Sequence, residues 1–319
     1  MQATASLGGS GEKAKGGIEK MDGVLNVYKH PGPTSHDIVD MARKALNMRK
    51  IGHAGTLDPL AEGVLLLCLG KGTRLSDYLT ELPKEYLAEI TFGITTSTYD
   101  AEGEITSRSE KEVSEEEVRE AVKEFVGEIE QIPPPASAVR HKGRKLYEWT
   151  REGVFIEPPP RKVIVYSFEL ESFDRQQRKG IFRITCSKGT YIRALARDIG
   201  EKLGCGAFLS HLVRTRVGPF KAEEAFPAKE LKKENRALIE EKIVPLVDAL
   251  PHFPLFQVDH KLALRIASGA VLPVRSYLFP VDKCVRVVSE NGQLVSIAKV
   301  MVKEGRFYLK PEKVFGYEW

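Results

Sequence analysis

The pattern of apolar and polar positions divides most of the chain into short strands and helices. Alternating or continuous apolar segments predict strands at residues 24–28, 64–69, 86–92, 163–168 and 181–186. Apolar residues at helical spacing predict helices at residues 35–46, 73–79, 114–125 and 191–203, with further helical signals over 228–243. The expected helix signals are Ser35 as an N-cap, a capping box of Ser114 with Glu117, and Gly204 as a stop.

The two ends of the chain follow different patterns. Residues 1–20 contain five glycines and no apolar periodicity, so we expect a flexible leader, with the structured chain beginning near Met21. Prolines at 251 and 254 indicate a domain junction. Beyond it, short apolar stretches separated by turns predict a small β domain that runs to Trp319.

Composition and charge narrow the class of protein without choosing a function. A chain of 319 residues with a net charge of +4 permits a nucleic-acid partner but does not require one. The longest apolar run, residues 64–69, is far shorter than the roughly 18 residues of a membrane span. Four cysteines without a CxxC pair argue against a zinc site or a disulfide framework, and fit a reducing cytoplasm.

Two clusters of basic residues stand out in the charge distribution, while acidic residues gather at 110–130. Residues 140–151 interleave Arg and Lys with aromatic side chains, and residues 43–50 carry four Lys or Arg. Either cluster is compatible with a solvated surface or with contacts to nucleic acid.

The first candidate for chemistry is Asp58, in the segment GHAGTLDPLAEGVL at residues 52–65. Asp followed by Pro is a common helix start, with Asp as the cap. However, Gly63 and the following strand leave room for barely one helical turn, and Pro59 holds residue 58 in an extended conformation. This interpretation gives a rigidly presented carboxylate, as a nucleophile requires.

Arg193 is the second candidate. With Thr190 as the expected N-cap, Arg193 lies in the first turn of its helix, where a cation opposes the helix dipole. A buried carboxylate is the obvious partner, and an Arg beside Asp58 would keep it ionised and fix its direction. The alternative is a surface Arg that packs on Tyr191. Tyr86 and His53 are open to plainer interpretations, as a core residue and as a turn residue.

In chain order, the four candidates are His53, Asp58, Tyr86 and Arg193, and the segments around them resemble the motifs of the TruB-type pseudouridine synthases. Besides residues 52–65, the similarity includes KGTR (71–74), KEY (84–86), STYDAEG (97–103), IPPPASA (132–138), KLYE (145–148), SKGTYIR (187–193), LGCGA (203–207) and LVRT (212–215). The chain departs from the family where Pro31 sits one residue late after Lys29 and where Ala136 stands in place of Tyr.

The resemblance implies an α+β fold. Its centre is a mixed, largely antiparallel sheet flanked by helices (residues 21–250), followed by a small PUA-like β-barrel that binds RNA (251–319). The implied activity is isomerisation of uridine 55 in the T loop of tRNA to pseudouridine, without metal or other cofactor. The implied setting is a cytoplasmic monomer that binds the tRNA T stem-loop, with no membrane association.

The resemblance also implies roles for single residues. Asp58 is the nucleophile or essential carboxylate, by attack on C1′, addition to C6, or a glycal route. Tyr86 stacks on the target base and acts as a base in proton transfer, and Arg193 pairs with Asp58. His53 fills the space left by the flipped nucleotide. The expected RNA-binding set is completed by Lys29, Arg140, Lys142, Arg144, Lys145, Tyr147, Leu212 and Arg214.

Three other functions remain open at this point. A guide-RNA-dependent pseudouridine synthase shares the loop around Asp58, but the long stretch at residues 132–153 is typical of the stand-alone type. A tRNA-folding chaperone would not need Asp58. A glycosidase would need two carboxylates about 5–9.5 Å apart, and the sequence nominates one carboxylate with a basic partner.

Overall fold

The computed structural model of the chain describes residues 21–134, 137, 140–141, 143–145, 148–149, 152, 154, 156, 158–274 and 280–318. The predicted leader at residues 1–20 therefore lies outside the described residues. Within the described part of the chain, no helix is long and apolar enough to cross a membrane.

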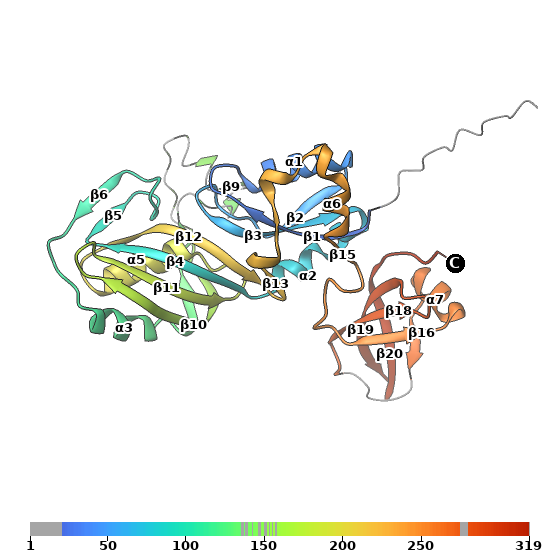
Figure 1. Cartoon of the computed structure of the whole chain (residues 1–319). Helices are drawn as coiled ribbons and strands as arrows, with labels where there is room; N and C mark the ends of the chain where they lie inside the picture. The colour runs from blue at the N-terminus through green and yellow to red at the C-terminus, as the bar shows by residue number, and fades with distance from the viewer. Residues whose placement is uncertain are drawn as a thin grey trace, which may run out of the picture.

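An eleven-stranded mixed sheet forms the larger part of the molecule (Figure 1). Its main order is β14-β1-β3-β12-β4-β11-β10-β7, with β2 beside β3, β13 beside β12 and β15 beside β1. Among the described strands of this sheet, only the pairs β1–β14 and β3–β12 are parallel, so the predicted largely antiparallel sheet is confirmed. The strands are β1 (Gly23–Lys29), β2 (Ile51–Ala54), β3 (Glu62–Leu69), β4 (Lys84–Phe92), β7 (Gly127–Gln131), β10 (Arg161–Asp174), β11 (Lys179–Cys186), β12 (Ala207–Val217), β13 (Phe220–Lys221), β14 (Phe226–Pro227) and β15 (Ile243–Pro245).

Helices cover this sheet on both faces. The described helices are α1 (Ser35–Leu46), α2 (Ser76–Glu81), α3 (Glu115–Lys123), α5 (Ile192–Lys202), α6 (Arg236–Glu241) and α7 (His260–Ala267). Short 3₁₀ turns are η1 (Gly70–Leu75), η2 (Ala222–Glu224), η3 (Ala228–Glu230) and η4 (Lys233–Asn235). The continuous apolar run of β3 follows from this arrangement. Leu65 and Leu67 pack under α1, while Val64 and Leu66 pack on the opposite face with α2.

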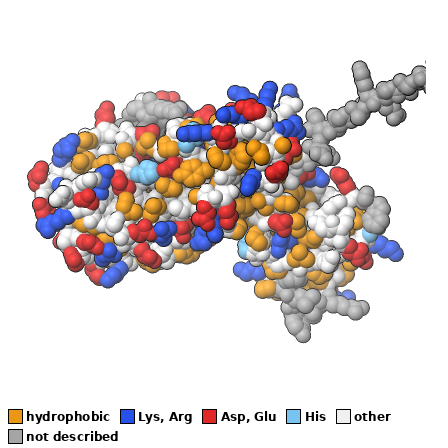
Figure 2. Space-filling view, viewed as in Figure 1, with side chains coloured by type: hydrophobic (Ala, Val, Ile, Leu, Met, Phe, Trp, Pro, Cys, Tyr) orange, Lys and Arg blue, Asp and Glu red, His pale blue; other side chains and the backbone are white. Residues whose placement is uncertain are grey.

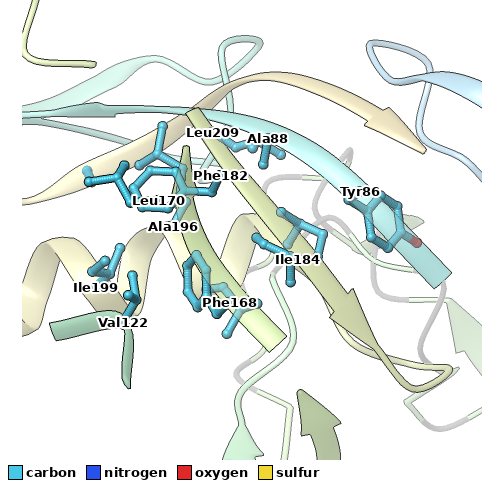
Figure 3. Close-up of a cluster of buried hydrophobic side chains, with 14 of the residues drawn as sticks. Tyr86, Ala88, Val122, Phe168, Leu170, Phe182, Ile184, Ala196, Ile199 and Leu209 are labelled. Atoms are coloured by element: carbon cyan, nitrogen blue, oxygen red, sulfur yellow. The ribbon is translucent and has the colours of Figure 1, made fainter. Parts of the chain in front are cut away.

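A second core lies under α3 and α5. Phe168, Phe182 and Ile184 on β10 and β11 pack against Val122 of α3 and Ile199 of α5 (Figure 3). Phe168 and Phe182 meet edge to face, with ring centroids 5.4 Å apart. This core fixes α5, and so the residues at its N-terminal end, against the sheet.

The last part of the chain forms a separate five-stranded sheet of order β16-β18-β19-β20-β17, with α7 beside it. Its strands are β16 (Leu255–Val258), β17 (Leu272–Val274), β18 (Cys284–Ser289), β19 (Leu294–Lys303) and β20 (Arg306–Val314). This curled sheet fits the expected PUA-like barrel. The helix α7, capped by Asp259, was not predicted. Two small hairpins complete the described strands: β5 (Ile94–Thr96) with β6 (Ile105–Arg108), and β8 (Arg140–His141) with β9 (Arg144–Lys145).

The two sheets share a hydrophobic cluster. Leu294 of β19 and Phe315, directly after β20, pack with Leu75 and Leu79 beside the large sheet. Arg286 holds the connecting segment by donating to the carbonyls of Val247 (2.6 Å) and Phe253 (2.8 Å). This cluster contains residues from both sides of the predicted junction, so it does not mark where one domain ends. The boundary at residues 250/251 stays a prediction. On the face in Figure 2, Lys, Arg, Asp and Glu side chains are interspersed and hydrophobic ones gather near the middle.

Several predicted helix ends differ from the structure. Thr34 is the N-cap of α1 and forms a capping box with Asp37, so the prediction of Ser35 as the cap is wrong by one residue. Residues 73–79 divide between a 3₁₀ turn and α2, and residues 228–243 divide into two 3₁₀ turns and the short α6. The long strand β12 was not predicted at all. The capping box of Ser114 with Glu117 is confirmed.

Candidate active site

The Asp58 loop, which we define as residues 55–61, joins β2 to β3 and is held from several sides. The Ser35 hydroxyl donates to the Leu57 carbonyl and accepts from the Leu57 N–H, both at 2.9 Å. The Gly32 N–H donates to the Pro59 carbonyl at 2.9 Å. Gly63 closes the loop at φ +104°, where an added Cβ would lie 2.2 Å from the Arg214 carbonyl oxygen. Asp58 is therefore presented by a fixed backbone.

Two buried cations, Lys29 and Arg214, donate hydrogen bonds to carbonyl groups of this loop. Lys29 is fully buried, and its Nζ donates to the carbonyls of Pro59 (2.9 Å) and Ala61 (2.6 Å). Arg214 is 1% exposed and donates to the carbonyls of Thr56 (3.1 Å) and Gly55 (3.3 Å), while its Nε donates to Val64 (2.7 Å). The donors of Lys29 and Arg214 are thus used inside the fold, and their role in RNA binding stays a prediction.

Replacing Lys29 with Met tests this supporting role through the pH dependence of stability. Burial lowers the pKa of Lys29 from 10.5 to about 8, with Asp58 opposing the shift. Between these pH values the unfolded chain binds more protons, so Lys29 makes the free energy of unfolding rise with pH. We expect the stability difference, wild type minus Lys29→Met, to grow by up to about 1.4 kcal/mol per pH unit in urea titrations from pH 8 to 10. A constant difference across this range would contradict a buried, charged Lys29.

Arg193 lies between two carboxylates. Its Nη2 is 2.9 Å from Oδ2 of Asp58, and its Nη1 is 3.1 Å from Oδ2 of Asp100. The side chains of Arg193 and Asp100 are 7% and 9% exposed, whereas that of Asp58 is 44% exposed. The predicted pairing of Arg193 with Asp58 is present. The arrangement leaves one carboxylate open to solvent and oriented by a buried cation.

Arg193 lies in the first turn of α5, as expected, but the cap differs from the prediction. Tyr191 is the N-cap and makes no side-chain cap hydrogen bond, while the Thr190 hydroxyl donates to the Ser187 carbonyl at 3.1 Å. A cation at this end of a helix opposes the helix dipole. The two carboxylates offset that cost, which explains why Arg193 is tolerated there.

Asp100 was not singled out in the sequence, although it lies inside the matched segment at residues 97–103. It is placed by a tight turn in which Tyr99 has a φ of +64°, a conformation that is uncommon for a non-glycine residue. The Arg197 guanidinium lies 4.9 Å from the centre of the Tyr99 ring. A positive φ at a bulky residue, next to an acid, is visible only in the structure.

Tyr86 lies on β4 beside Arg214 of β12, at the edge of the second core (Figure 3). Its side chain points its hydroxyl away from Phe168 and Phe182 (Figure 3). It is 8% exposed, and burial raises its pKa to about 12, with Arg214 opposing the rise and Asp58 adding to it. The phenol is therefore neutral at physiological pH, and Tyr86 lies within electrostatic reach of Asp58.

Tyr191 is a second tyrosine near Asp58 that the sequence did not single out as a site residue. Burial raises the pKa of its phenol; Ser137 opposes this rise and the charge of Asp58 adds to it. The candidate site thus contains two carboxylates, one buried arginine and two neutral phenols. In the described part of the chain, no group of three or more His, Cys, Asp or Glu side chains is arranged to hold a metal ion.

The other predicted RNA-binding residues have different outcomes. Leu212 is 8% exposed, packs in the same core as Tyr86, and its contact with RNA stays a prediction. His53 is half-buried on β2, two residues before the Asp58 loop, and its role stays a prediction. Arg144 stacks 4.4 Å from the Trp149 ring centre and pairs with Glu152 at 2.6 Å. The side chains of Arg140, Lys142, Lys145 and Tyr147 lie outside the described residues.

Comparison with known proteins identifies the class of enzyme. The family model described as "TruB family pseudouridylate synthase (N terminal domain)" matches residues 43–192, and "tRNA pseudouridylate synthase B C-terminal domain" matches residues 193–285. A Bacillus pumilus protein named tRNA pseudouridine synthase B is 41% identical over 307 residues, covering 93% of this chain and 99% of its own length. A Thermotoga maritima protein of the same name is 41% identical over 281 residues, covering 87% and 89%.

Solved structures give the same fold. The structure titled "Crystal Structure of a Cbf5-Nop10-Gar1 Complex" has a TM-score of 0.73 at 30% identity and covers 94% of this chain and 88% of its own. Sequence and fold together define a pseudouridine synthase, an enzyme that isomerises uridine in RNA. Within that class, the chain belongs to the TruB family.

Proposed function

We propose that this chain converts uridine 55 in the T loop of tRNA to pseudouridine at the site formed by Asp58, Arg193 and Tyr86. The observation that carries the proposal is the half-exposed Asp58 carboxylate, held 2.9 Å from an Arg193 that is itself buried and paired with Asp100. The relatives named tRNA pseudouridine synthase B support tRNA as the substrate.

The reaction needs one reactive carboxylate and no change in oxidation state. The bond from uracil N1 to ribose C1′ breaks, the base turns, and C5 bonds to C1′. The C5 proton leaves and a proton is gained at N1, so atoms balance within the isomer. Asp58 acts by attack on C1′, by addition to C6, or by assisting a glycal route. In each case the rigid loop and Arg193 direct one carboxylate oxygen at the nucleotide.

A uridine stacked in an RNA loop does not reach this carboxylate, so the nucleotide has to flip out of the stack. Unstacking costs a few kcal/mol, and a preorganised T loop lowers that cost. His53 fills the vacated space, and the basic segment at residues 140–151 grips the T arm through phosphate contacts and stacking. The C-terminal β domain (251–319) adds RNA contacts, and the protein acts as a cytoplasmic monomer.

Replacing Tyr86 with Phe separates stacking from proton transfer. Burial raises the pKa of Tyr86 to about 12, so its phenol is neutral. A neutral phenol can accept a proton from the substrate only if it gives up its own hydroxyl proton in the same step. Tyr86→Phe keeps the ring, so we expect tRNA affinity within about twofold of wild type and a single-turnover rate lower by about 10²–10⁴-fold. Filter binding and rapid-quench measurements check the two values. A wild-type rate for Tyr86→Phe would refute the proton-transfer role.

The proposed function itself is tested with an unmodified tRNA transcript and the purified protein alone. A stand-alone enzyme forms pseudouridine on this substrate, whereas a guide-RNA-dependent enzyme needs added RNA and protein. A transcript with cytidine at position 55 serves as the control and should remain unmodified. Formation of pseudouridine only at another position would contradict uridine 55 as the target.

A further inference from the structure

Gln131, the last residue of β7, is 2% exposed and uses both ends of its side-chain amide on one distant residue. Its Nε2 donates to the Tyr191 carbonyl oxygen at 3.1 Å. Its Oε1 accepts from the Tyr191 backbone N–H at 2.7 Å. A buried amide whose two polar atoms are both bonded holds its partner in one geometry. We call this pair of hydrogen bonds the Gln131 clamp.

The clamp holds the peptide groups from which α5 starts. Tyr191 is the N-cap of α5 and provides no side-chain cap hydrogen bond. Its carbonyl oxygen also accepts from the N–H groups of Ala194 (3.1 Å) and Leu195 (3.2 Å). Helix starts are normally fixed by a Ser, Thr, Asp or Asn at this position. Here the fixing group comes from a strand at the edge of the sheet.

Two groups of the candidate site depend on this helix start. Arg193 follows Tyr191 by two residues and pairs with Asp58 at 2.9 Å. The Tyr191 phenol lies close enough to Asp58 for the carboxylate charge to raise its pKa. A displacement of about 1 Å at a catalytic group costs on the order of 10²-fold in rate. Gln131 also directly precedes the connector that leads into the basic segment at residues 140–151.

We propose that Gln131 is a positioning residue for the isomerisation, acting through Tyr191 and Arg193. The inference rests on the proposed function, because its effect on rate is an effect on the Asp58 chemistry. Gln131 touches neither Asp58 nor the reacting nucleotide in this account. Its contribution is to hold the start of α5, so that the Arg193 guanidinium meets the Asp58 carboxylate in one orientation.

The first test replaces Gln131 with Met, which has a similar length and no hydrogen-bonding ends. We expect a 10- to 100-fold lower single-turnover rate with tRNA affinity close to wild type. The chain offers a matched control in Gln293, whose Nε2 donates to the Glu318 carbonyl (2.9 Å) and whose Oε1 accepts from the Glu318 N–H (3.2 Å). Gln293→Met removes the same kind of pair away from the site and should keep the wild-type rate.

The second test is a pH profile of Gln131→Glu. A neutral carboxyl reproduces the clamp, with its O–H donating to the Tyr191 carbonyl and its C=O accepting from the N–H. An ionised carboxylate has no donor and repels that carbonyl, and burial favours the neutral form. The rate of Gln131→Glu divided by that of wild type should therefore rise as pH falls from 8.5 to 5.5. Circular dichroism at each pH gives the folded fraction, and a fall in rate that only follows a loss of folded protein would indicate a role in stability alone.

The inference is overturned by a wild-type rate in Gln131→Met, or by a Gln131→Glu ratio that does not change with pH. If Gln131→Met does not fold, the Gln131→Glu profile decides alone. Amide hydrogen exchange at residues 191–195 separates the clamp from the proposed function. Faster exchange there in Gln131→Met, but not in Gln293→Met, would show that Gln131 holds the start of α5. If the wild-type protein were inactive in the same experiments, the proposed function would be refuted while this structural role of Gln131 would stand.

Discussion

Replacing Asp58 with Asn is expected to abolish pseudouridine formation while leaving the fold and tRNA binding intact. The amide has nearly the shape of the carboxylate but is neither a nucleophile nor a base at C1′ or C6. Removal of a residue that acts as a nucleophile lowers the rate by about 10⁴-fold or more. Because the Asp58 side chain is 44% exposed, its neutralisation should change the free energy of unfolding by less than about 1 kcal/mol. Single-turnover assays and urea titrations measure both effects.

Asp77→Asn is the matched control for this variant. Asp77 is an exposed carboxylate paired with Lys313 at 3.1 Å, on the far side of β3 from α1 and away from the site. It should keep the wild-type rate. The Asp58→Asn variant also separates catalysis from RNA folding, since it should still bind and refold tRNA if the protein has a chaperone activity. A rate within tenfold of wild type for Asp58→Asn would contradict a central role for this carboxylate.

Replacing Arg193 with Met is expected to lower both activity and stability. Asp58 loses the cation that orients it, and the nearly buried Asp100 is left without its charged partner. Breaking a buried ion pair on one side costs about 3–5 kcal/mol of stability, and loss of orientation at Asp58 lowers the single-turnover rate by about 10²–10³-fold. Urea titrations and rapid-quench assays on folded protein check these values.

Two further variants show whether the bridging geometry is responsible. Arg193→Lys keeps the charge but has one ammonium in place of a fork that reaches two carboxylates, so it should recover stability more than rate. Arg183→Met is the matched control, because Arg183 also bridges two carboxylates, Glu85 at 3.2 Å and Glu171 at 2.6 Å, with its side chain 41% exposed. It should cost little in either property. Equal losses in the two Met variants would contradict a specific role for Arg193.

The sequence predicted the pairing of Arg193 with Asp58 better than the residues that support the pair. The predicted extended conformation at Asp58 and the unfavourable position of the Arg193 cation are local features, because Pro59 and the helix start determine them within a few residues. Their pairing was foreseen for the same reason: a cation opposed to a helix dipole needs an anion nearby. Asp100 and Tyr191 were not predicted as site residues. Their position beside Arg193 depends on how the loop between β5 and β6 packs against the start of α5, which the sequence does not show.

The sequence did not show which basic residues near a motif are buried. Lys29 and Arg214 were expected to bind RNA, yet they are buried and bind carbonyl groups around the Asp58 loop. A tight loop without its own secondary structure leaves carbonyl groups to be satisfied, and buried cations do this here. The strand β12, which carries Arg214, was missed because its alternation mixes His, Ser and Arg with apolar residues.

The most direct test of the account is release of tritium from tRNA labelled at C5 of uridine, using the purified protein without guide RNA. Formation of the C5–C1′ bond expels the hydrogen at C5, so the label reports the isomerisation itself. We expect release of one equivalent per tRNA by the wild-type protein, and none above background by Asp58→Asn. No release by the wild type, or equal release by both proteins, would contradict it.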